Sequence, residues 1–422
     1  MSNQTGAQQP IYDARTLGKP KMAILGLQHM FAMFGATVLV PFLFGINPAI
    51  VLFMNGLGTL LFILITKGKS PAYLGSSFAF LAPGLLIIEQ FGYSYALGGF
   101  AVVGLCGCIV AAIIYKFGSD WIDVVLPPAA MGPVVALIGL ELAGSAASTA
   151  GLLPAEGTPE TANVIVFLVT LGVAVFGSVL FRKFLSVIPI LISVVCGYVA
   201  AYLLGVVDFT AVTEASWLAL PNFSTPKFHP QAIAIMLPAL LVIVSEHIGH
   251  QVVTSKIVGR DLIKDPGLHR SLFADNFSSF ISACIGSVPT TTYGENIGVM
   301  AMTKVYSVYV IGGAAVMSLC CAFIGKLTAL INTIPGAVIG GISFLLYGMI
   351  GTSGLRILVD SKVDYNRTRN TVLSSVILVV GLSGVSIQLG SIALKGMSLA
   401  ALVGMILSLL FHFFDKYGLM ND

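Results

Sequence analysis

The sequence predicts an all-α polytopic membrane protein. Three observations lead to this fold class: an apolar composition, a long series of apolar segments and an internal repeat. Of the 422 residues, 57% are hydrophobic and only 9% are charged, and the mean hydropathy is +0.97. A soluble domain carries about 25% charged residues, because water must wet its surface. This chain cannot cover a water-facing surface of its size, so we expect it to lie in a lipid bilayer.

The predicted spans follow from the length of the apolar segments. A helix needs about 20 apolar residues to cross the hydrocarbon core of a bilayer. We divided the chain at charged residues and at Gly, Pro and Asn clusters. The first segment is followed by many similar ones, so we interpret it as a span rather than a cleaved leader. The fourteen predicted spans are 22–44, 47–66, 72–91, 94–116, 124–147, 162–181, 184–206, 230–258, 269–286, 288–304, 305–325, 334–352, 369–387 and 394–414.

The positively charged residues predict the orientation. If the N-terminus is cytoplasmic and the spans alternate, eighteen of the 21 Lys and Arg residues fall on the cytoplasmic side. Only Lys227, Lys326 and Lys395 fall outside. Cytoplasmic loops are enriched in Lys and Arg. We therefore predict that both termini are cytoplasmic.

Three short motifs occur twice, in the same order and seven predicted spans apart. Because seven is odd, the second half enters the membrane from the opposite side. Such a 7+7 inverted repeat is typical of transporters that hold their substrate near the middle of the membrane, between the repeats. The paired motifs are LQHMFA (27–32) with SEHIGH (245–250), GSSFAF (75–80) with TTTYGE (290–295), and PPAAMG (127–132) with PGAVIG (335–340).

The third and tenth spans begin with residues that disfavour a helix. Thr, Ser, Tyr and Phe favour extended chain, and Gly75, Pro289 and Gly294 interrupt helices. We predict a short β-strand followed by a half helix in each of these spans. Two such strands could pair and satisfy their backbone groups, which lipid does not tolerate unpaired. Each half helix would then direct N–H groups at the membrane centre, where a ligand with acceptor groups fits.

Two acids and a histidine lie in the central segments. Glu246 is in the middle of the eighth span, where an acid costs roughly 2.5–3.5 kcal/mol and is usually functional. The alternative is an acid that neighbouring hydroxyls merely satisfy. His250, four residues on, shares the helical face of Glu246. Glu295 stands at a strand–helix junction, and its simpler interpretation is an acid favoured by the helix dipole. We expect Glu295 to be ionised and Glu246 to carry the proton.

The remaining polar and aromatic residues are more ambiguous. Phe78 and Tyr293 stand at the two junctions and are candidate ligand contacts, whereas Tyr347 is equally compatible with packing. His247 points away from the face of Glu246 and is more typical of a helix-packing histidine, and Asp275 of a structural acid. We find no nucleophile–base pair, metal cluster or phosphate loop in the sequence. We therefore predict neither an enzyme nor a metal site.

The residues 295–304, ENIGVMAMTK, fit the signature [Q/E/P]-N-x-G-x-x-x-x-T-[R/K/G] of the nucleobase–ascorbate transporter family. With QHMFAMFGATVLVP, PAYLGSSFAF, SEHIGH and TTTYGENIGVMA, the chain resembles that family from about residue 28 to the last span. The resemblance implies a core domain that moves against a gate domain. The implied parts are a cytoplasmic tail (1–20), core spans 1–4 (21–117), gate spans 5–7 (118–229), core spans 8–11 (230–327), and gate spans 12–14 with a short C-terminal tail (328–422).

The resemblance also implies proton-coupled uptake of uracil across the bacterial cytoplasmic (inner) membrane by alternating access. Uracil has two N–H donors and two carbonyl acceptors. Two carboxylates would accept its N–H groups, and backbone N–H groups of two half-helix ends would donate to its carbonyls. The implied substrate-binding residues are Glu246, Glu295, Phe78, Gly294, Tyr293 and Tyr347, and the implied proton-coupling residues are His250 and Glu246.

Other functions remain open at this point. Xanthine, urate or ascorbate could replace uracil, because the family also carries these substrates. An anion transporter of the same architecture is a weaker alternative, because two acids at the site disfavour an anion. The expected coupling ion is the proton, with no cofactor, and the sequence leaves sodium coupling open. The resemblance further implies a homodimer formed through the gate domains, and we expect no nucleic-acid partner.

Overall fold

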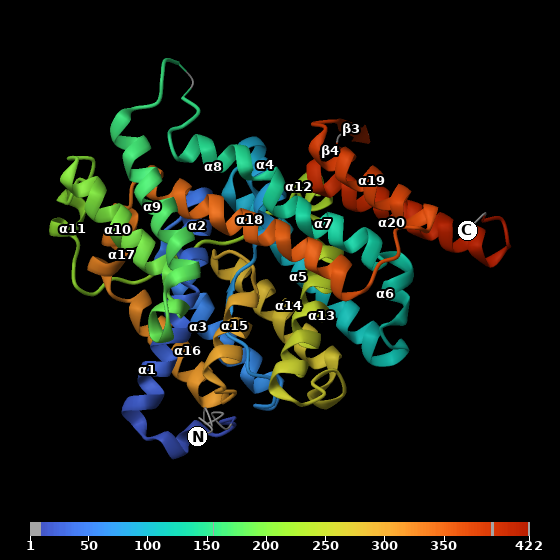
Figure 1. Ribbon diagram of the computed structural model, residues 1–422, viewed down its shortest axis with the longest axis horizontal. Coiled ribbons are helices and arrows are strands. Elements are labelled where there is room, and N and C mark those ends of the chain that lie inside the picture. The colour runs from blue at the N-terminus through green and yellow to red at the C-terminus, as the bar shows by residue number, and fades with distance from the viewer. Residues whose placement is uncertain (1–9, 155, 390–391, 421–422) are drawn as a thin grey trace, which may run out of the picture.

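The computed structural model describes residues 10–154, 156–389 and 392–420, and this part of the chain is mostly helical (Figure 1). Eight of its helices are long and apolar enough to cross a membrane. Four further apolar helices have 10–17 residues. The predicted fold class is therefore confirmed at the level of a polytopic, mostly helical membrane protein.

The eight candidate membrane-crossing segments include three that are interrupted. Met33 separates α1 from α2, Leu142 separates α7 from α8, and two residues separate α12 from α13. The segments are α1 (Lys19–Ala32) with α2 (Phe34–Phe44), α3 (Pro48–Ile65), α5 (Tyr93–Phe117), α7 (Pro128–Glu141) with α8 (Ala143–Thr149), α9 (Thr161–Leu180), α12 (Pro230–Met236) with α13 (Ala239–Val258), α18 (Gly336–Asp360) and α20 (Gly396–Lys416).

Shorter helices complete the fold. The apolar ones are η2 (Phe78–Phe80) continuing into α4 (Leu81–Phe91), α10 (Pro189–Leu203), α16 (Val308–Ala322) and α19 (Thr368–Leu382). Two more polar helices stand at the centre, α14 (Leu268–Ile285) and α15 (Gly294–Thr303). The connections contain η1 (Ala14–Leu17), α6 (Asp120–Val125), η3 (Lys183–Val187), α11 (Thr210–Glu214), η4 (Ile263–Gly267), α17 (Gly325–Asn332), and the hairpin of β3 (Ser386–Leu389) and β4 (Ile392–Lys395).

A two-stranded antiparallel sheet lies inside the helical bundle. Strand β1 (Leu74–Ser76) precedes η2 and α4, and strand β2 (Thr290–Thr292) precedes α15. The two strands pair with each other, and all six of their residues are buried. Each strand is therefore followed by a helix that begins inside the protein.

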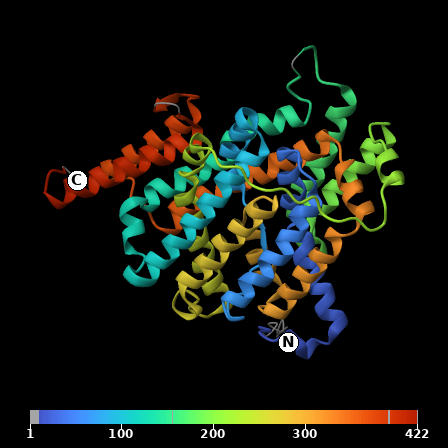
Figure 2. The same cartoon turned by 180° about the vertical axis from the view of Figure 1, so that it is seen from behind.

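The helices pack in two recurring arrangements. Helices α7 and α18 lie against each other and cross the molecule, with α9 and α10 towards one end and α19 and α20 towards the other (Figure 1). Helix α5 packs along α14, and α3 packs along α16. The view from behind shows these four helices on the face opposite α18 (Figure 2). The sheet contacts α3 and α14 of the second arrangement.

Glycines allow α5 to approach α14 closely. A Cβ atom on Gly104 would lie 2.8 Å from the backbone nitrogen of Phe280, and one on Gly107 would lie 1.9 Å from Oδ1 of Asn276. Small residues let membrane helices pack with their backbones close together, where van der Waals contact replaces the missing hydrophobic drive. Helix α14 is therefore fixed firmly against α5.

The N-terminal segment ties two central helices together at one end of the molecule. The Ile11 N–H donates to the Lys304 carbonyl over 2.8 Å, and the Tyr306 N–H donates to the Ile11 carbonyl over 2.8 Å. The Tyr12 hydroxyl donates to the carbonyl of Val258, the last residue of α13, over 2.8 Å. The ends of α13 and α15 are thus held by the same short segment.

Substitution of Gly107 tests the α5–α14 contact. Gly107→Ala should lower stability by roughly 1–3 kcal/mol, because the new methyl group clashes with Asn276 in a packed interface. The measurement is the apparent Tm of the purified protein in detergent. Gly313→Ala in α16 is the matched control, because nothing lies within 4 Å of its added Cβ. Equal Tm values for the two variants would contradict this packing.

Candidate substrate site

The candidate site is built around the N-terminus of α15. Tyr293 is the N-cap residue in extended conformation, and Gly294 begins the helix. The Ile297 N–H makes a helical hydrogen bond to the Tyr293 carbonyl, so the N–H groups of the three preceding residues have no partner within the helix. Gly294 is exposed, whereas the strand residues directly before it are buried. Glu295 lies in the first turn of α15, where the helix dipole favours an acid.

Helix α13 places the second acid and the histidine beside this N-terminus. His250 Nδ1 lies 3.2 Å from the Thr292 hydroxyl, and its Nε2 would lie 3.8 Å from a Cβ on Gly294. Glu246 stands one helical turn earlier on the same face and is half-buried. The charges of Glu246 and Glu295 are close enough to interact electrostatically. The structure therefore brings together the two acids and the histidine that the sequence singles out.

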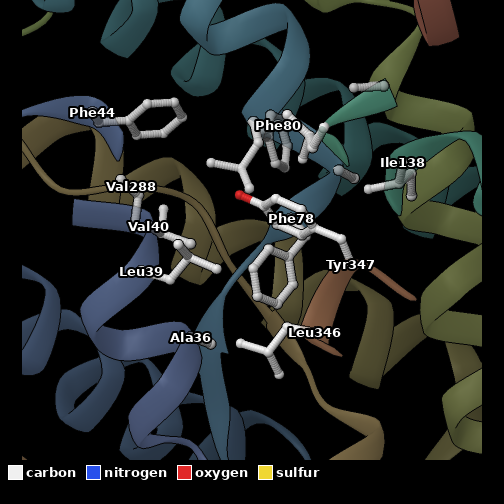
Figure 3. Close-up of a cluster of buried hydrophobic side chains, with 14 of the residues drawn as sticks. Ala36, Leu39, Val40, Phe44, Phe78, Phe80, Ile138, Val288, Leu346 and Tyr347 are labelled. Carbon is white, nitrogen blue, oxygen red and sulfur yellow. The ribbon is translucent and has the colours of Figure 1, made fainter. Parts of the chain in front are cut away.

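Aromatic side chains surround the two junctions. The rings of Phe78 and Tyr293 lie 5.9 Å apart, and the Tyr293 hydroxyl donates to the Ser76 carbonyl of β1. Tyr347 comes from α18 and shares one buried cluster with Phe78 (Figure 3). Its hydroxyl is buried and has no hydrogen-bond partner among the described residues. Residues from both halves of the chain thus meet at Phe78.

The first junction differs in detail from the predicted geometry. Phe78 opens a short 3₁₀ turn, η2, and the α-helix α4 begins three residues later. Sequence patterns rarely resolve this distinction, because 3₁₀ turns are common at helix N-termini and use the same residues. The side chain of Phe78 is only 8% exposed, so the ring packs inside the protein.

A buried polar network lies behind the site. His247 Nε2 is 3.0 Å from the Ser271 hydroxyl, and its Nδ1 is 3.7 Å from the Asp275 carboxylate. The Thr292 hydroxyl lies 3.4 Å from His247 Nδ1 and also contacts His250. The sequence suggested unrelated packing roles for His247 and Asp275. In the structure, both residues belong to a network that reaches Thr292 of β2, the strand that leads into the site. These residues are distant from one another in the sequence, so no sequence pattern predicts the network.

A cavity of about 250 Å³ extends alongside α15. Glu295 and Tyr293 line it at the N-terminus of the helix, and Met302 lines it at the other end. Glu246, His250, Gly294, Phe78 and Tyr347 do not line it. Most residues that line the cavity could not be predicted from the sequence, because they are apolar or small. The lining residues not predicted are Ala32, Met33, Gly35, Ala36, Ser178, Ser186, Val187, Pro189, Ile190, Gly298, Val299, Met302, Leu346 and Met349.

These features define a class of protein. A cavity between apolar helices reaches one carboxylate, that of Glu295, in the first turn of α15, which is the arrangement of a transporter site for a small polar molecule. The chain belongs to the Permease family, whose sequence profile matches residues 20–390. It is therefore a transporter and not an enzyme.

Relatives of known name are closely similar over nearly the whole chain. The uracil permease of Escherichia coli strain K12 is 58% identical over 388 residues, which are 92% of this chain and 90% of that protein. The uracil permease of Paenibacillus larvae is 53% identical over 402 residues, covering 94% of this chain and 96% of the relative. The uracil permease of Bacillus subtilis is 48% identical over 399 residues, or 91% of each chain.

Solved structures share the fold at low sequence identity. The anion transporter Slc26a9 from mouse superposes with a TM-score of 0.72 at 11% identity, covering 98% of this chain and 74% of that one. The transmembrane domain of the cyanobacterial bicarbonate transporter BicA gives a TM-score of 0.60 at 15% identity, covering 96% of this chain and 97% of that domain. At such identities the likeness extends to the fold alone.

Substitution of Tyr293 tests the link between the strands and the site. Tyr293→Phe leaves the buried Ser76 carbonyl without its donor, which should cost roughly 1–3 kcal/mol of stability. Thermal unfolding and hydrogen exchange of residues 74–78 measure the effect. Tyr198→Phe is the control, because it removes a half-buried hydroxyl contact to Thr333 far from the sheet. If Tyr293→Phe is as stable as the wild type, the hydroxyl is not needed to hold β1.

Proposed function

We propose that this protein takes up uracil across the bacterial cytoplasmic membrane. The observation that carries the substrate assignment is the 58% identity to a uracil permease over 92% of the chain. The geometry supports it independently. Uracil offers two N–H donors and two carbonyl acceptors, and the region around α15 offers two carboxylates and the free N–H groups of a helix N-terminus.

In the proposed site, Glu246 and Glu295 accept the two uracil N–H groups. The backbone N–H groups of Phe78 and Gly294 donate to the carbonyls, because each opens a helical turn whose first N–H groups have no helical partner. Tyr293 and Tyr347 line the ligand. The rings of Phe78 and Tyr293 lie 5.9 Å apart and are tilted by 54°, and aromatic side chains at this position favour a flat heterocyclic ligand.

Proton coupling is proposed through Glu246 and His250. They lie one turn apart on α13, and His250 contacts Thr292 directly before the α15 junction. A carboxyl group that binds a proton from outside neutralises one of two interacting acids and removes their repulsion. Proton and uracil would then bind together and permit the conformational change. No cofactor is needed for this mechanism.

We further propose fourteen spans arranged as two inverted repeats. The contacts between helices support this, because contacts made by helices of one repeat have counterparts made by helices of the other. The contact of α5 with α14 corresponds to that of α16 with α3, and the contact of α9 with α10 corresponds to that of α19 with α20. The corresponding helices are α3 and α14, α5 and α16, α7 and α18, α9 and α19, and α10 and α20. The antiparallel pairing of β1 and β2 is also consistent with a twofold axis between the repeats. In this arrangement α4 and α15 are the half helices of spans 3 and 10.

The same contacts support a core domain (21–117 and 230–327) and a gate domain (118–229 and 328–422). Helices α3, α5, α14 and α16 pack among themselves in the proposed core, and α7, α9, α10, α18, α19 and α20 in the proposed gate. The cavity runs between α15 of the core and α10 and α18 of the gate. Its far end, at Met302, is two residues from Lys304, which the basic-residue asymmetry assigns to the cytoplasm. We propose that the structure faces inward, that both termini are cytoplasmic, and that two copies associate through their gate domains.

Glu246→Gln tests the coupling. Uptake of labelled uracil into proteoliposomes should no longer be driven by an inward proton gradient, because the amide cannot exchange a proton. Glu89→Gln is the matched control, because Glu89 is exposed at the end of α4. Proton-driven accumulation that survives in Glu246→Gln would refute the role of Glu246.

Competition distinguishes uracil from other substrates. Labelled-uracil uptake by the wild type should be stimulated by a pH gradient, be independent of sodium, and be inhibited by unlabelled uracil. Xanthine, urate and ascorbate should not compete, because they are larger or anionic and the site holds two acids. Stronger competition by one of these three than by uracil itself would overturn the substrate assignment.

A further inference from the structure

The outer edges of the central sheet carry backbone groups that the partner strand cannot reach. The Ser77 N–H donates to the Pro289 carbonyl, so in the antiparallel register these two residues form a hydrogen-bonded pair. Hydrogen-bonded pairs alternate with non-hydrogen-bonded ones. The next pair along, Ser76 with Thr290, therefore directs its N–H and C=O groups away from the partner strand. An apolar bundle leaves no water to satisfy them.

One side chain satisfies both outward groups of Thr290. The Ser279 hydroxyl donates to the Thr290 carbonyl over 2.6 Å, and the same oxygen accepts the Thr290 N–H over 3.1 Å. Neighbouring serines of α14 strengthen the attachment. Ser278 contacts the Thr290 hydroxyl at 2.7 Å, and Ser282 donates to the Val288 carbonyl. Strand β2 is thus attached along its outer edge to α14.

Helix α14 is itself a fixed support. Gly104 and Gly107 of α5 bring the backbone of that helix against it, and a Cβ on Gly58 of α3 would lie 2.1 Å from the Ser278 hydroxyl. The position of the Ser279 hydroxyl is therefore fixed relative to α3 and α5. Thr290 is only four residues before Gly294, and the chain between them is extended, so the position of Thr290 determines where α15 begins.

The first half of the chain contains a matching contact. The Thr59 hydroxyl of α3 accepts the N–H of Leu74, at the outer edge of β1, over 2.9 Å. Thr59 and Ser279 stand at the same distance from the first residues of α3 and α14, two helices of 18 residues each. Each strand before a half helix is therefore attached to a buried hydroxyl of the preceding span.

We propose that Ser279 is a positioning residue for the substrate site, although it does not touch the cavity. Its hydroxyl fixes the outer edge of β2. It thereby determines the position of the Gly294 N–H and the Glu295 carboxylate, which are proposed to bind the substrate. This inference rests on the proposed function for its kinetic consequences. Its structural consequence, the attachment of β2, does not depend on the substrate.

The test compares Ser279→Ala with Ser279→Thr and Ser279→Cys. Loss of the hydroxyl should raise the KM for uracil roughly tenfold, with Vmax changed by less than about twofold, because the site is displaced and not destroyed. Threonine retains the hydroxyl and should restore KM, and cysteine, a weaker donor and acceptor, should give an intermediate KM. If the alanine variant does not fold, the threonine and cysteine variants still give the graded comparison.

Ser318→Ala is the matched control. Ser318 is equally buried and donates to the Leu52 carbonyl across the α16–α3 contact over 2.8 Å, a hydrogen bond that includes no residue of β1 or β2. It should leave KM unchanged. An equal rise of KM in Ser318→Ala and Ser279→Ala would overturn the proposal, because any lost core hydrogen bond would then suffice. An unchanged KM in Ser279→Ala would also overturn it.

Hydrogen exchange without substrate separates this inference from the proposed function. Ser279→Ala should accelerate exchange in residues 288–292, and Ser279→Thr should not. If the wild type transports no uracil, the proposed function fails, and the exchange result alone decides the inference. Unchanged exchange would then overturn it, and accelerated exchange would support it.

Discussion

The fold depends on one constraint: every buried backbone N–H and C=O group must find a hydrogen-bond partner where there is no water. An unbroken helix meets this requirement internally, but a helix that begins in the middle of the bundle does not. The pairing of β1 with β2 resolves the conflict, because each strand supplies partners to the other. Hydroxyls of Thr59, Ser279 and Tyr293 satisfy groups that point outward. The chain can therefore begin α15 directly after a buried strand, with the first N–H groups of the helix at an exposed glycine.

The two acids, Glu246 and Glu295, differ in their surroundings. A carboxylate at the start of α15 is stabilised by the adjacent N–H groups, whereas Glu246 on α13 lies in the middle of a long helix without such donors. In the proposed mechanism, the occupancy of one acid by a proton or by a ligand N–H affects the other through their charges. This coupling is the physical basis on which a proton and a neutral heterocycle could bind together. The cavity between α15, α10 and α18 reaches Glu295 and Tyr293 at the start of α15.

Much of this arrangement could be predicted from the sequence, for reasons particular to each element. The long apolar segments can be predicted from their composition. Gly75, Pro289 and Gly294 indicate the interruptions, because these residues disfavour a regular helix. Glu246 and Glu295 are visible because acids are rare in apolar segments. The junction positions indicate Phe78 and Tyr293 as ligand contacts, and the resemblance to the nucleobase–ascorbate transporters implies the same role for Tyr347. The cavity walls and the attachments of Ser279 and Thr59 could not be predicted, because buried apolar, small and hydroxyl residues are common in every span and their partners are distant in sequence.

The central claim is that the two acids and the two helix N-termini act on one flat ligand, and a structure determined with uracil bound tests it most directly. The account predicts the ring between Glu246 and Glu295, with its N–H groups on the two carboxylates and its carbonyls on the N–H groups of Phe78 and Gly294. A uracil molecule that contacts neither carboxylate, or that binds away from the start of α15, would contradict it.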